Sequence, residues 1–143
     1  MAGDVVIKCR GLVKGKGEGE ALAAPTTLSF WGEVDPLSGR VIAAGHPLEG
    51  RSLRGKVLVI ESTKGSSATS LVMGLAHQQG NAPAAIVNVN VDCLAVLECV
   101  VNGIPMVAEL EQDPFEIIET GDHVCVNADN GTITVTKRRR IAR

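Results

Sequence analysis

The hydrophobic pattern changes period along the chain, and the first half of the chain shows short apolar runs broken by glycine and proline. The run Val5–Cys9 predicts a first strand. The glycines that follow predict a Lys- and Gly-rich loop over residues 11–19, then a short extended stretch at Glu20–Ala23 and a turn at Pro25. We therefore expect a strand-rich N-terminal half, with further extended stretches at Leu28–Trp31 and Arg40–Ala43.

The middle of the chain alternates between strand and helix patterns. Val57–Ile60 predicts a buried strand, and apolar residues then recur at helical spacing from Leu71 to Ala76. Two more strands are predicted at Ala84–Asn88 and Ile104–Val107. Such a series is typical of a sheet with parallel pairing and short loops.

A second helix is predicted between the last two of these strands. Asp92 can cap its N-terminus, and Gly103 can end it. Its apolar face is expected to consist of Leu94, Ala95, Leu97, Val100 and Val101.

The end of the chain predicts a hairpin followed by a basic tail. His123–Asn127 and Thr132–Thr136 alternate with period two, and Asn130-Gly131 between them is a strong turn signal. We interpret residues 1–143 as a single α/β domain closed by this hairpin. The basic residues in 137–143 are expected to form a solvated tail, or else a contact with a partner chain.

The stretch Lys56–Gln79 carries the first candidate for chemistry. Between its strand and its helix lie Gly65, Ser66 and Ser67, with Lys64 beside them. Three interpretations stay open from the residues alone. The serines can cap the helix, the loop can bind an anion at the helix N-terminus, or one hydroxyl can be catalytic.

Composition and charge reduce the number of function classes that fit this chain. A net charge of −2 and 2% aromatic residues argue against a nucleic-acid binder. No signal peptide or membrane span is apparent, so we expect a cytoplasmic protein without membrane contact. The cysteines lie far apart in apolar stretches, which favours buried reduced thiols and no metal site in this chain: Cys9, Cys93, Cys99 and Cys125.

Other candidate residues carry weaker signals. Asp35 and His46 can point into a site or shape their own loops. Gly15-Lys16-Gly17 can cradle a phosphate, although it lacks the usual strand–loop–helix context. There is no Gly-x-Ser-x-Gly motif, and the three histidines are scattered, so a hydrolytic triad is not expected.

The order and spacing of several short motifs form a recognisable pattern: Gly32–Pro36 with Gly39, His46-Pro47 with Gly50, Gly55–Val59, Gly65–Ser67 with Ser70, Ala82–Ile86, Gly103–Pro105 and Thr120–Asp122. Over nearly the whole chain, this pattern resembles the small, swivelling-domain subunit of the aconitase X family. The loop before Gly65 departs slightly, because Ser62-Thr63-Lys64 stands where relatives often have Pro and Arg.

The resemblance implies a β/β/α swivelling domain like domain 4 of aconitase, and a hydro-lyase that works only with a large subunit in a heterodimer or higher assembly. The large subunit would hold the iron–sulfur cluster, and this chain would bind no cofactor alone. By similarity, Ser66 would be the proton acceptor, and Ser67 and the N–H groups from Gly65 onward would bind the substrate carboxylate, with Lys64 beside them. The partner's iron would assist departure of the β-hydroxyl.

The family contains two dehydration reactions. The chain is not rich in Lys/Glu ion pairs, which suggests a mesophile and favours cis-3-hydroxy-L-proline as the hydroxy-acid substrate, with Δ1-pyrroline-2-carboxylate as product. Dehydration of mevalonate 5-phosphate to trans-anhydromevalonate 5-phosphate is the alternative. A non-catalytic anion-binding module is a third possibility.

Overall fold

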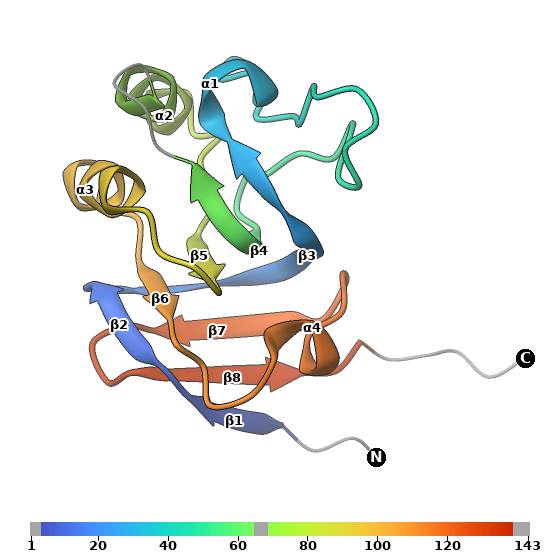
Figure 1. The fold of residues 1–143 in the computed structure, drawn as a ribbon, viewed down its shortest axis with the longest axis vertical. Helices are drawn as coiled ribbons and strands as arrows, with labels where there is room; N and C mark the ends of the chain where they lie inside the picture. The colour runs from blue at the N-terminus through green and yellow to red at the C-terminus, as the bar shows by residue number, and fades with distance from the viewer. Residues whose placement is uncertain (1–3, 65–68, 139–143) are drawn as a thin grey trace, which may run out of the picture.

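The computed structural model describes residues 4–64 and 69–138, which form a mixed α/β fold in three layers (Figure 1). The predicted site residues Gly65, Ser66 and Ser67 lie outside the described residues. The elements are β1 (Val5–Lys8), β2 (Arg10–Val13), β3 (Lys16–Ser29), α1 (Phe30–Glu33), β4 (Val57–Lys64), α2 (Thr69–Gln78), β5 (Ala85–Asn88), α3 (Cys93–Asn102), β6 (Met106–Ala108), α4 (Pro114–Ile117), β7 (His123–Asn127) and β8 (Thr132–Thr136).

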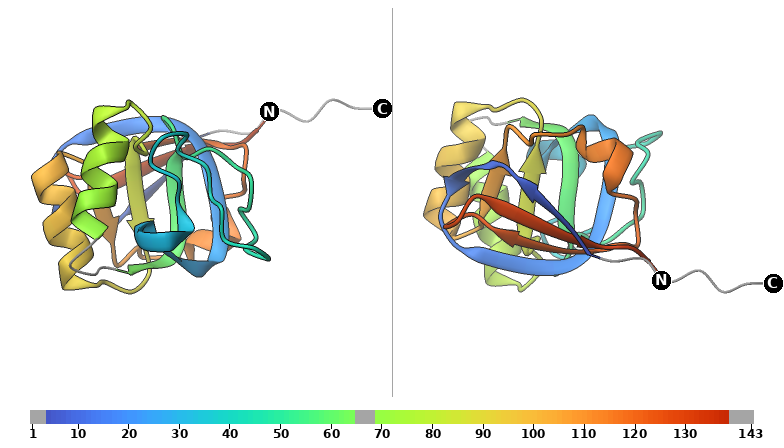
Figure 2. Two further views of the ribbon diagram at one scale, coloured as in Figure 1. Left: turned by 90° about the horizontal axis from the view of Figure 1, so that it is seen from above. Right: turned by 90° about the horizontal axis from the view of Figure 1, so that it is seen from below.

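The strands follow the order β1-β8-β7-β3-β4-β5-β6-β2. Strands β3 to β6 pair in parallel, as the strand–helix alternation predicts, and β1, β8, β7 and the start of β3 pair antiparallel. Helices α2 and α3 cover one face of the parallel strands, and the antiparallel strands cover the other (Figures 1 and 2). The result is the β/β/α arrangement that the resemblance implies.

Successive side chains along the central strands point to opposite faces, so the protein has two separate hydrophobic cores. On β4, Leu58 and Ile60 belong to the core shared with the helices, whereas Val57 and Val59 belong to the core shared with the antiparallel strands. All four side chains are fully buried. A strand that is covered on both faces has a continuous apolar sequence, which explains the apolar run Val57–Ile60.

Strand β3 takes part in both the antiparallel and the parallel pairing. Because its first residues are already paired, the expected loop over residues 11–19 is wrong. Residues 16–20 pair with β7, and the strand then bends so that its later residues pair with β4. A Cβ added at Gly17 would lie 2.1 Å from the Ala84 carbonyl oxygen, and one at Gly19 would lie 2.2 Å from that of Gly55. The glycines therefore serve close backbone packing inside the strand, not loop formation.

The predicted turn at Pro25 is also wrong. Pro25 lies within β3, where the pairing with β4 shifts between Ala24 and Thr27. Proline is tolerated at such an irregularity because it cannot donate a ladder hydrogen bond. The extended stretch expected at Leu28–Trp31 ends early, since a short helical turn begins at Phe30.

The caps of α3 are as predicted, but its buried face is not. The Asp92 carboxylate accepts hydrogen bonds from the N–H groups of Leu94 and Ala95, and Gly103 ends the helix in a left-handed conformation. Ala95 and Cys99 face the core, because small side chains allow the helix to lie close to the sheet. Four of the five residues expected to be buried are instead exposed: Leu94, Leu97, Val100 and Val101.

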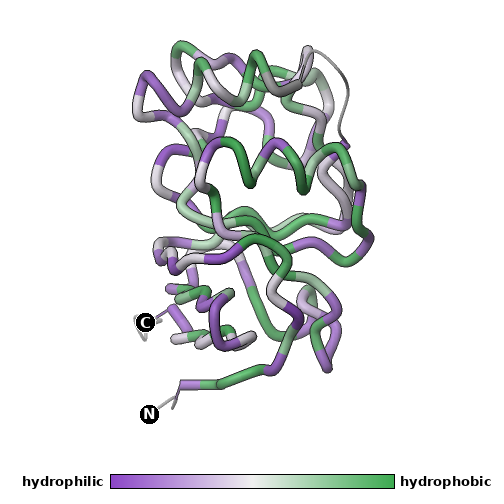
Figure 3. Tube along the Cα trace, turned by 90° about the vertical axis from the view of Figure 1, so that its left-hand side faces the viewer, coloured by the Kyte–Doolittle hydropathy of each residue, from purple (hydrophilic) through white to green (hydrophobic). Residues whose placement is uncertain are grey.

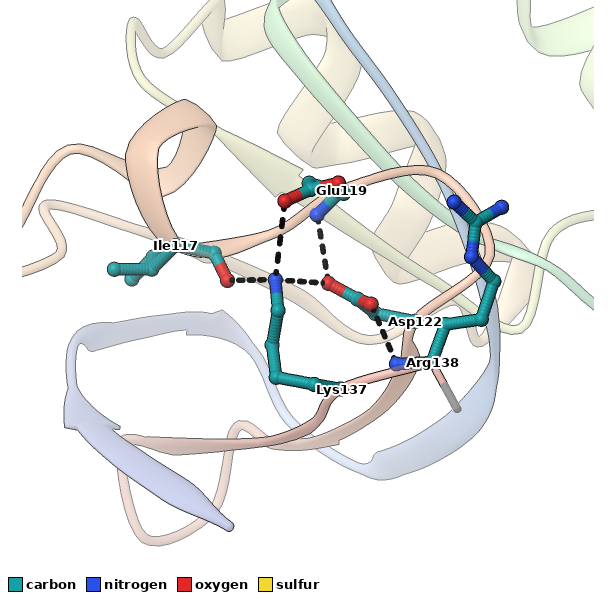
Figure 4. Close-up of polar contacts among 5 residues, drawn as sticks. All are labelled: Ile117, Glu119, Asp122, Lys137 and Arg138. Carbon is teal, nitrogen blue, oxygen red and sulfur yellow. Dashed lines mark hydrogen bonds and ion pairs between the residues drawn. The ribbon is translucent and has the colours of Figure 1, made fainter. Parts of the chain in front are cut away.

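The start of the basic tail is anchored rather than solvated. Asp122 is buried, with 2% of its surface exposed, and accepts from the Lys137 ammonium at 2.6 Å and from the backbone N–H groups of Arg138 and Glu119, both at 2.8 Å (Figure 4). Burial alone would raise the pKa of Asp122, but these hydrogen bonds outweigh it and lower the pKa. Lys137 also donates to the Ile117 carbonyl oxygen, so the network holds the end of β8 against the turn before β7.

The cysteines are free thiols, but not all are buried as expected. Cys99 is buried, Cys9 and Cys125 are half-buried, and Cys93 is exposed. Within residues 4–64 and 69–138, no helix is both long enough and apolar enough to cross a membrane.

Candidate active site at the carboxyl ends of the parallel strands

The carboxyl ends of β3, β4 and β5 share one edge of the parallel sheet. Ser29, Lys64 and Asn88 end these strands, and the chain then continues toward α1, α2 and α3 respectively. This edge is where ligands bind in open α/β sheets, because helix N-termini and loops converge on it. The left view of Figure 2 shows α2 and α3 running side by side over the sheet from this edge.

Strand β4 delivers the predicted site loop to this edge. The strand is four residues longer than Val57–Ile60, and its last residue, Lys64, is exposed and paired with Ser29 of β3. Helix α2 begins at Thr69, so the strand and the helix on either side of the Gly-Ser-Ser sequence are confirmed. The structure tests neither the roles of Gly65, Ser66 and Ser67, which lie outside the described residues, nor that of Lys64.

A buried polar pair fixes the end of β4 against β5. The hydroxyl of Thr63 lies 3.2 Å from the side-chain amide of Asn88, and both residues are fully buried. The amide is best satisfied when its oxygen accepts from the Thr63 N–H, because its nitrogen then donates to the Val87 carbonyl oxygen. Since buried polar groups are costly unless paired, this pair holds the backbone that leads into Lys64.

Trp31 is a surface feature that the sequence did not single out. It is the protein's one tryptophan, it follows β3 directly at this edge, and 56% of its surface is exposed. Next to it, the Glu33 carboxylate accepts from the Ser29 N–H at 2.6 Å and stabilises the turn. A large exposed aromatic side chain beside a candidate site is a common anchor for a ligand or a partner.

The weaker candidate residues have local roles. The His46 ring accepts from the Leu48 N–H through Nδ1 and therefore donates through Nε2 to the Thr27 carbonyl oxygen, at 2.9 Å. Asp35 accepts from the Leu37 N–H and from the Ser38 hydroxyl. Asp35 shapes its own loop, and His46 shapes its loop and also fastens it to β3, so both have the local role that was one of the two interpretations left open.

The Gly15-Lys16-Gly17 sequence does not form a phosphate cradle. The Gly15 N–H already donates to the Asp129 carboxylate at 2.9 Å, and Lys16 and Gly17 belong to β3. The backbone groups therefore serve the sheet and the β7–β8 turn.

A pocket of about 390 Å³ beside the carboxyl ends of β5 and β6 is strongly acidic. Its lining includes the carboxylates of Glu61, Glu109, Glu111 and Asp113. Such a pocket repels an anionic substrate. The Lys64 side of the edge is therefore better suited to an anionic ligand.

Glu98 is a buried acid that the sequence did not reveal. Only 4% of its surface is exposed, and its Oε2 atom has no hydrogen-bond partner within the described parts of the chain. Burial, assisted by the negative charge of Asp92, raises the pKa of Glu98 to about 7. One turn later on α3, Asn102 lies beside Gly74 of α2, so Glu98 occupies the α2 side of α3.

The cysteines of this chain do not fit an iron–sulfur cluster. Within the described residues, no three cysteines come together, and the one group of three metal-ligating side chains is Glu18, His123 and Cys125. Clusters of this kind need several thiolates around one site. This chain therefore lacks the ligands for such a cofactor in the residues that the structure describes.

The family model of the aconitase X swivel domain matches residues 6–135. The chain belongs to this family. The aconitase X swivel fold is also seen in the crystal structure of Thermococcus kodakaraensis aconitase X (holo-form), with a TM-score of 0.85 and 33% identity, over 93% of this chain and 99% of that one.

Two relatives of the chain carry a more specific name. The chain is 39% identical over 134 residues to the phosphomevalonate dehydratase small subunit of Methanosarcina mazei, which covers 94% of this chain and 93% of the relative. It is 42% identical over 127 residues to that of Methanothermobacter thermautotrophicus, covering 89% and 97%. These relatives match the alternative dehydration reaction, and cis-3-hydroxy-L-proline dehydration finds no support among them.

The raised pKa of Glu98 predicts a pH-dependent stability. An acid with an ordinary pKa of 4.5 unfolded and about 7 folded disfavours the folded state as pH rises through this range. Between pH 4.5 and 8, we expect the free energy of unfolding of the wild type to fall by about 1–3 kcal/mol relative to that of Glu98→Gln. Urea unfolding at several pH values measures the difference.

Glu116→Gln serves as the control, because Glu116 is an exposed acid on α4. It should keep the pH dependence of the wild type. Parallel profiles for the wild type and Glu98→Gln would contradict the assignment of a raised pKa to Glu98.

Proposed function

We propose that this chain is the small subunit of a two-subunit hydro-lyase that converts mevalonate 5-phosphate to trans-anhydromevalonate 5-phosphate. The observation that carries the proposal is the near end-to-end similarity to phosphomevalonate dehydratase small subunits. The composition argument for cis-3-hydroxy-L-proline is weaker, because ion-pair content reports on thermal adaptation and not on the substrate.

In this proposal, the loop between β4 and α2 supplies the proton acceptor. The Ser66 side chain first loses its hydroxyl proton to solvent, and the resulting alkoxide takes the proton from the carbon α to the substrate carboxylate. The alkoxide forms near neutral pH only where positive charge stabilises it; Lys64 at the end of β4 and the N-terminus of the ten-residue helix α2 provide that charge.

The same positive surroundings suit an anionic substrate. We assign Gly65, Ser67 and Lys64 to substrate binding, with Ser67 and backbone N–H groups as donors to the carboxylate. Negative charge builds up on that carboxylate as the proton leaves, so these donors act most strongly in the transition state.

The rest of the site belongs to a large subunit, which in this proposal holds an iron–sulfur cluster. Support comes from the names of the relatives, which are small subunits. It also comes from the lack of fitting ligands in the described parts of this chain, noted above.

Helices α2 and α3 present the surface on which we expect the large subunit to dock. Leu71 and Leu75 lie one turn apart on α2, and Leu94, Leu97 and Val101 follow one side of α3; all are exposed, Leu71 and Val101 to 73%. Asp, Glu, Lys and Arg are absent from α2, and the single charged residue of α3, Glu98, is buried. Figure 3 shows α3 largely in the colour of hydrophobic residues on the side that faces the viewer.

An outer helix of a free protein normally carries a charged face. These two helices do not, so a partner is needed to cover them. The partner we infer is the large subunit, because α2 starts next to the proposed catalytic loop, where the two halves of the site must meet.

The role of Ser66 is tested in the complex with the large subunit. Ser66→Ala should lower kcat for mevalonate 5-phosphate by about 10²–10⁴-fold, because a positioned general base contributes that much. Ser67→Ala should act mainly on KM if Ser67 binds the carboxylate. Steady-state kinetics on the co-purified complexes measure both effects.

Ser52→Ala is the matched control, since Ser52 precedes β4 at the opposite end of the strand. It should leave turnover unchanged. Full activity in Ser66→Ala would show that Ser66 is not the base, and a larger loss of kcat in Ser67→Ala would transfer the role to Ser67.

The docking surface is tested by charge insertion. Leu97→Lys should weaken association with the large subunit by more than tenfold, since it places a charge in a desolvated apolar contact; this corresponds to about 1.4 kcal/mol or more. Leu97 is exposed in the free chain, so folding should be unaffected. Binding can be measured by calorimetry.

Leu37→Lys is the control, because Leu37 is also exposed but lies in the loop between α1 and β4. It should bind like the wild type. If Leu97→Lys also binds like the wild type, the large subunit does not cover α3.

A further inference from the structure

The outer face of the antiparallel strands carries a cluster of three metal-ligating side chains: Glu18 of β3 with His123 and Cys125 of β7. Alternation along β7 explains the arrangement. Val124 and Val126 point into the core, so His123 and Cys125 point outward together. Glu18 is in register with Cys125 on the neighbouring strand and therefore faces it directly.

The ligand atoms are already close together. The Cys125 thiol donates to the Glu18 carboxylate at 2.9 Å, and the His123 Nε2 atom lies 3.4 Å from the same oxygen. All three ligand atoms lie within 4.8 Å of one another. In a tetrahedral zinc site, bond lengths of about 2.0–2.3 Å place neighbouring ligand atoms about 3.5 Å apart.

We propose that Glu18, His123 and Cys125 form a surface site for a zinc ion or a similar thiophilic divalent cation. One thiolate, one imidazole and one carboxylate are ligand types that zinc accepts, and two anionic ligands neutralise its charge. Binding replaces the thiol proton: the S–H bond breaks, an S–Zn bond forms, and one proton leaves to solvent.

The fourth coordination position is open. Glu18 and Cys125 form one wall of a pocket of about 480 Å³, whose other lining residues include Lys16, Asn127 and Thr134. A water molecule or a small ligand can complete the tetrahedron from this side, as in zinc sites with three protein ligands.

The site is separate from the proposed active site. It lies on the antiparallel layer, on the other side of the central strands from α2 and α3 (Figure 1). A bound ion would link β3 to β7 near the bend of β3, so we expect it to stabilise the fold. If no ion binds here, the proposed dehydratase function is unaffected, because the two sites share no residue.

The sequence gives no signal for this site. Glu18 lies 105 residues before His123, and a single His-x-Cys pair matches no ligand spacing of known structural zinc motifs. The expectation of no metal in this chain followed from the wide spacing of the four cysteines, and only the strand register brings the three side chains together.

Titration of the full chain with Co²⁺ under reducing conditions, without a histidine tag, tests the proposal. We expect one Co²⁺ per chain, with a thiolate-to-cobalt charge-transfer band that Zn²⁺ abolishes by displacement. Cys125→Ser should lose the band, and His123→Gln and Glu18→Gln should each weaken binding by more than tenfold. Calorimetry in two buffers should show about one proton released per Zn²⁺ at pH 7.

Cys93→Ser is the matched control, because Cys93 is the exposed thiol of α3 and lies in another layer. It should bind like the wild type. Circular dichroism of each variant confirms folding, since all three ligands are at least partly exposed. Absence of saturable binding, or a band that survives Cys125→Ser, would overturn the proposal.

Discussion

Strand β3 is the element on which the rest of the structure depends, because it pairs with both sheets. Its start forms antiparallel hydrogen bonds with β7, and its end forms parallel ones with β4. The bend requires backbone contact at Gly17 and Gly19, where a side chain would collide with carbonyl oxygens. Because β3 is hydrogen-bonded to both β7 and β4, it joins the layers that enclose the two cores on either side of β4 and β5.

The same central strands carry the proposed chemistry to one edge. The Thr63–Asn88 pair and the pairing of Lys64 with Ser29 hold the end of β4 in place. The apolar α2–α3 surface beside this edge then needs a partner, since its helices carry no exposed Asp, Glu, Lys or Arg within the described residues. An uncovered apolar side next to the proposed site fits the proposal that this chain completes the site of a large subunit.

The sequence predicted features that depend on local chemistry. These include the parallel series, the β7–β8 hairpin with Asn130-Gly131, and the Asp92 cap. The sequence did not predict features that depend on contacts between distant residues. Examples are the close packing at the glycines of β3 and the anchoring of Lys137, whose partner Asp122 lies in the turn before β7. On α3, apolar residues occur all round, so periodicity could not identify the side that packs. For the candidate site, the order of strand and helix around Gly65–Ser67 was predictable, but the buried acid Glu98 was not.

The most direct test of the central claim is a substrate comparison on the complex of this chain with the large subunit. The account predicts release of trans-anhydromevalonate 5-phosphate from mevalonate 5-phosphate, with a kcat/KM for cis-3-hydroxy-L-proline at least 100-fold lower, about 2.7 kcal/mol in transition-state stabilisation. Product formation can be followed by NMR. Turnover of cis-3-hydroxy-L-proline alone, or of mevalonate 5-phosphate by this chain without its partner, would contradict the account.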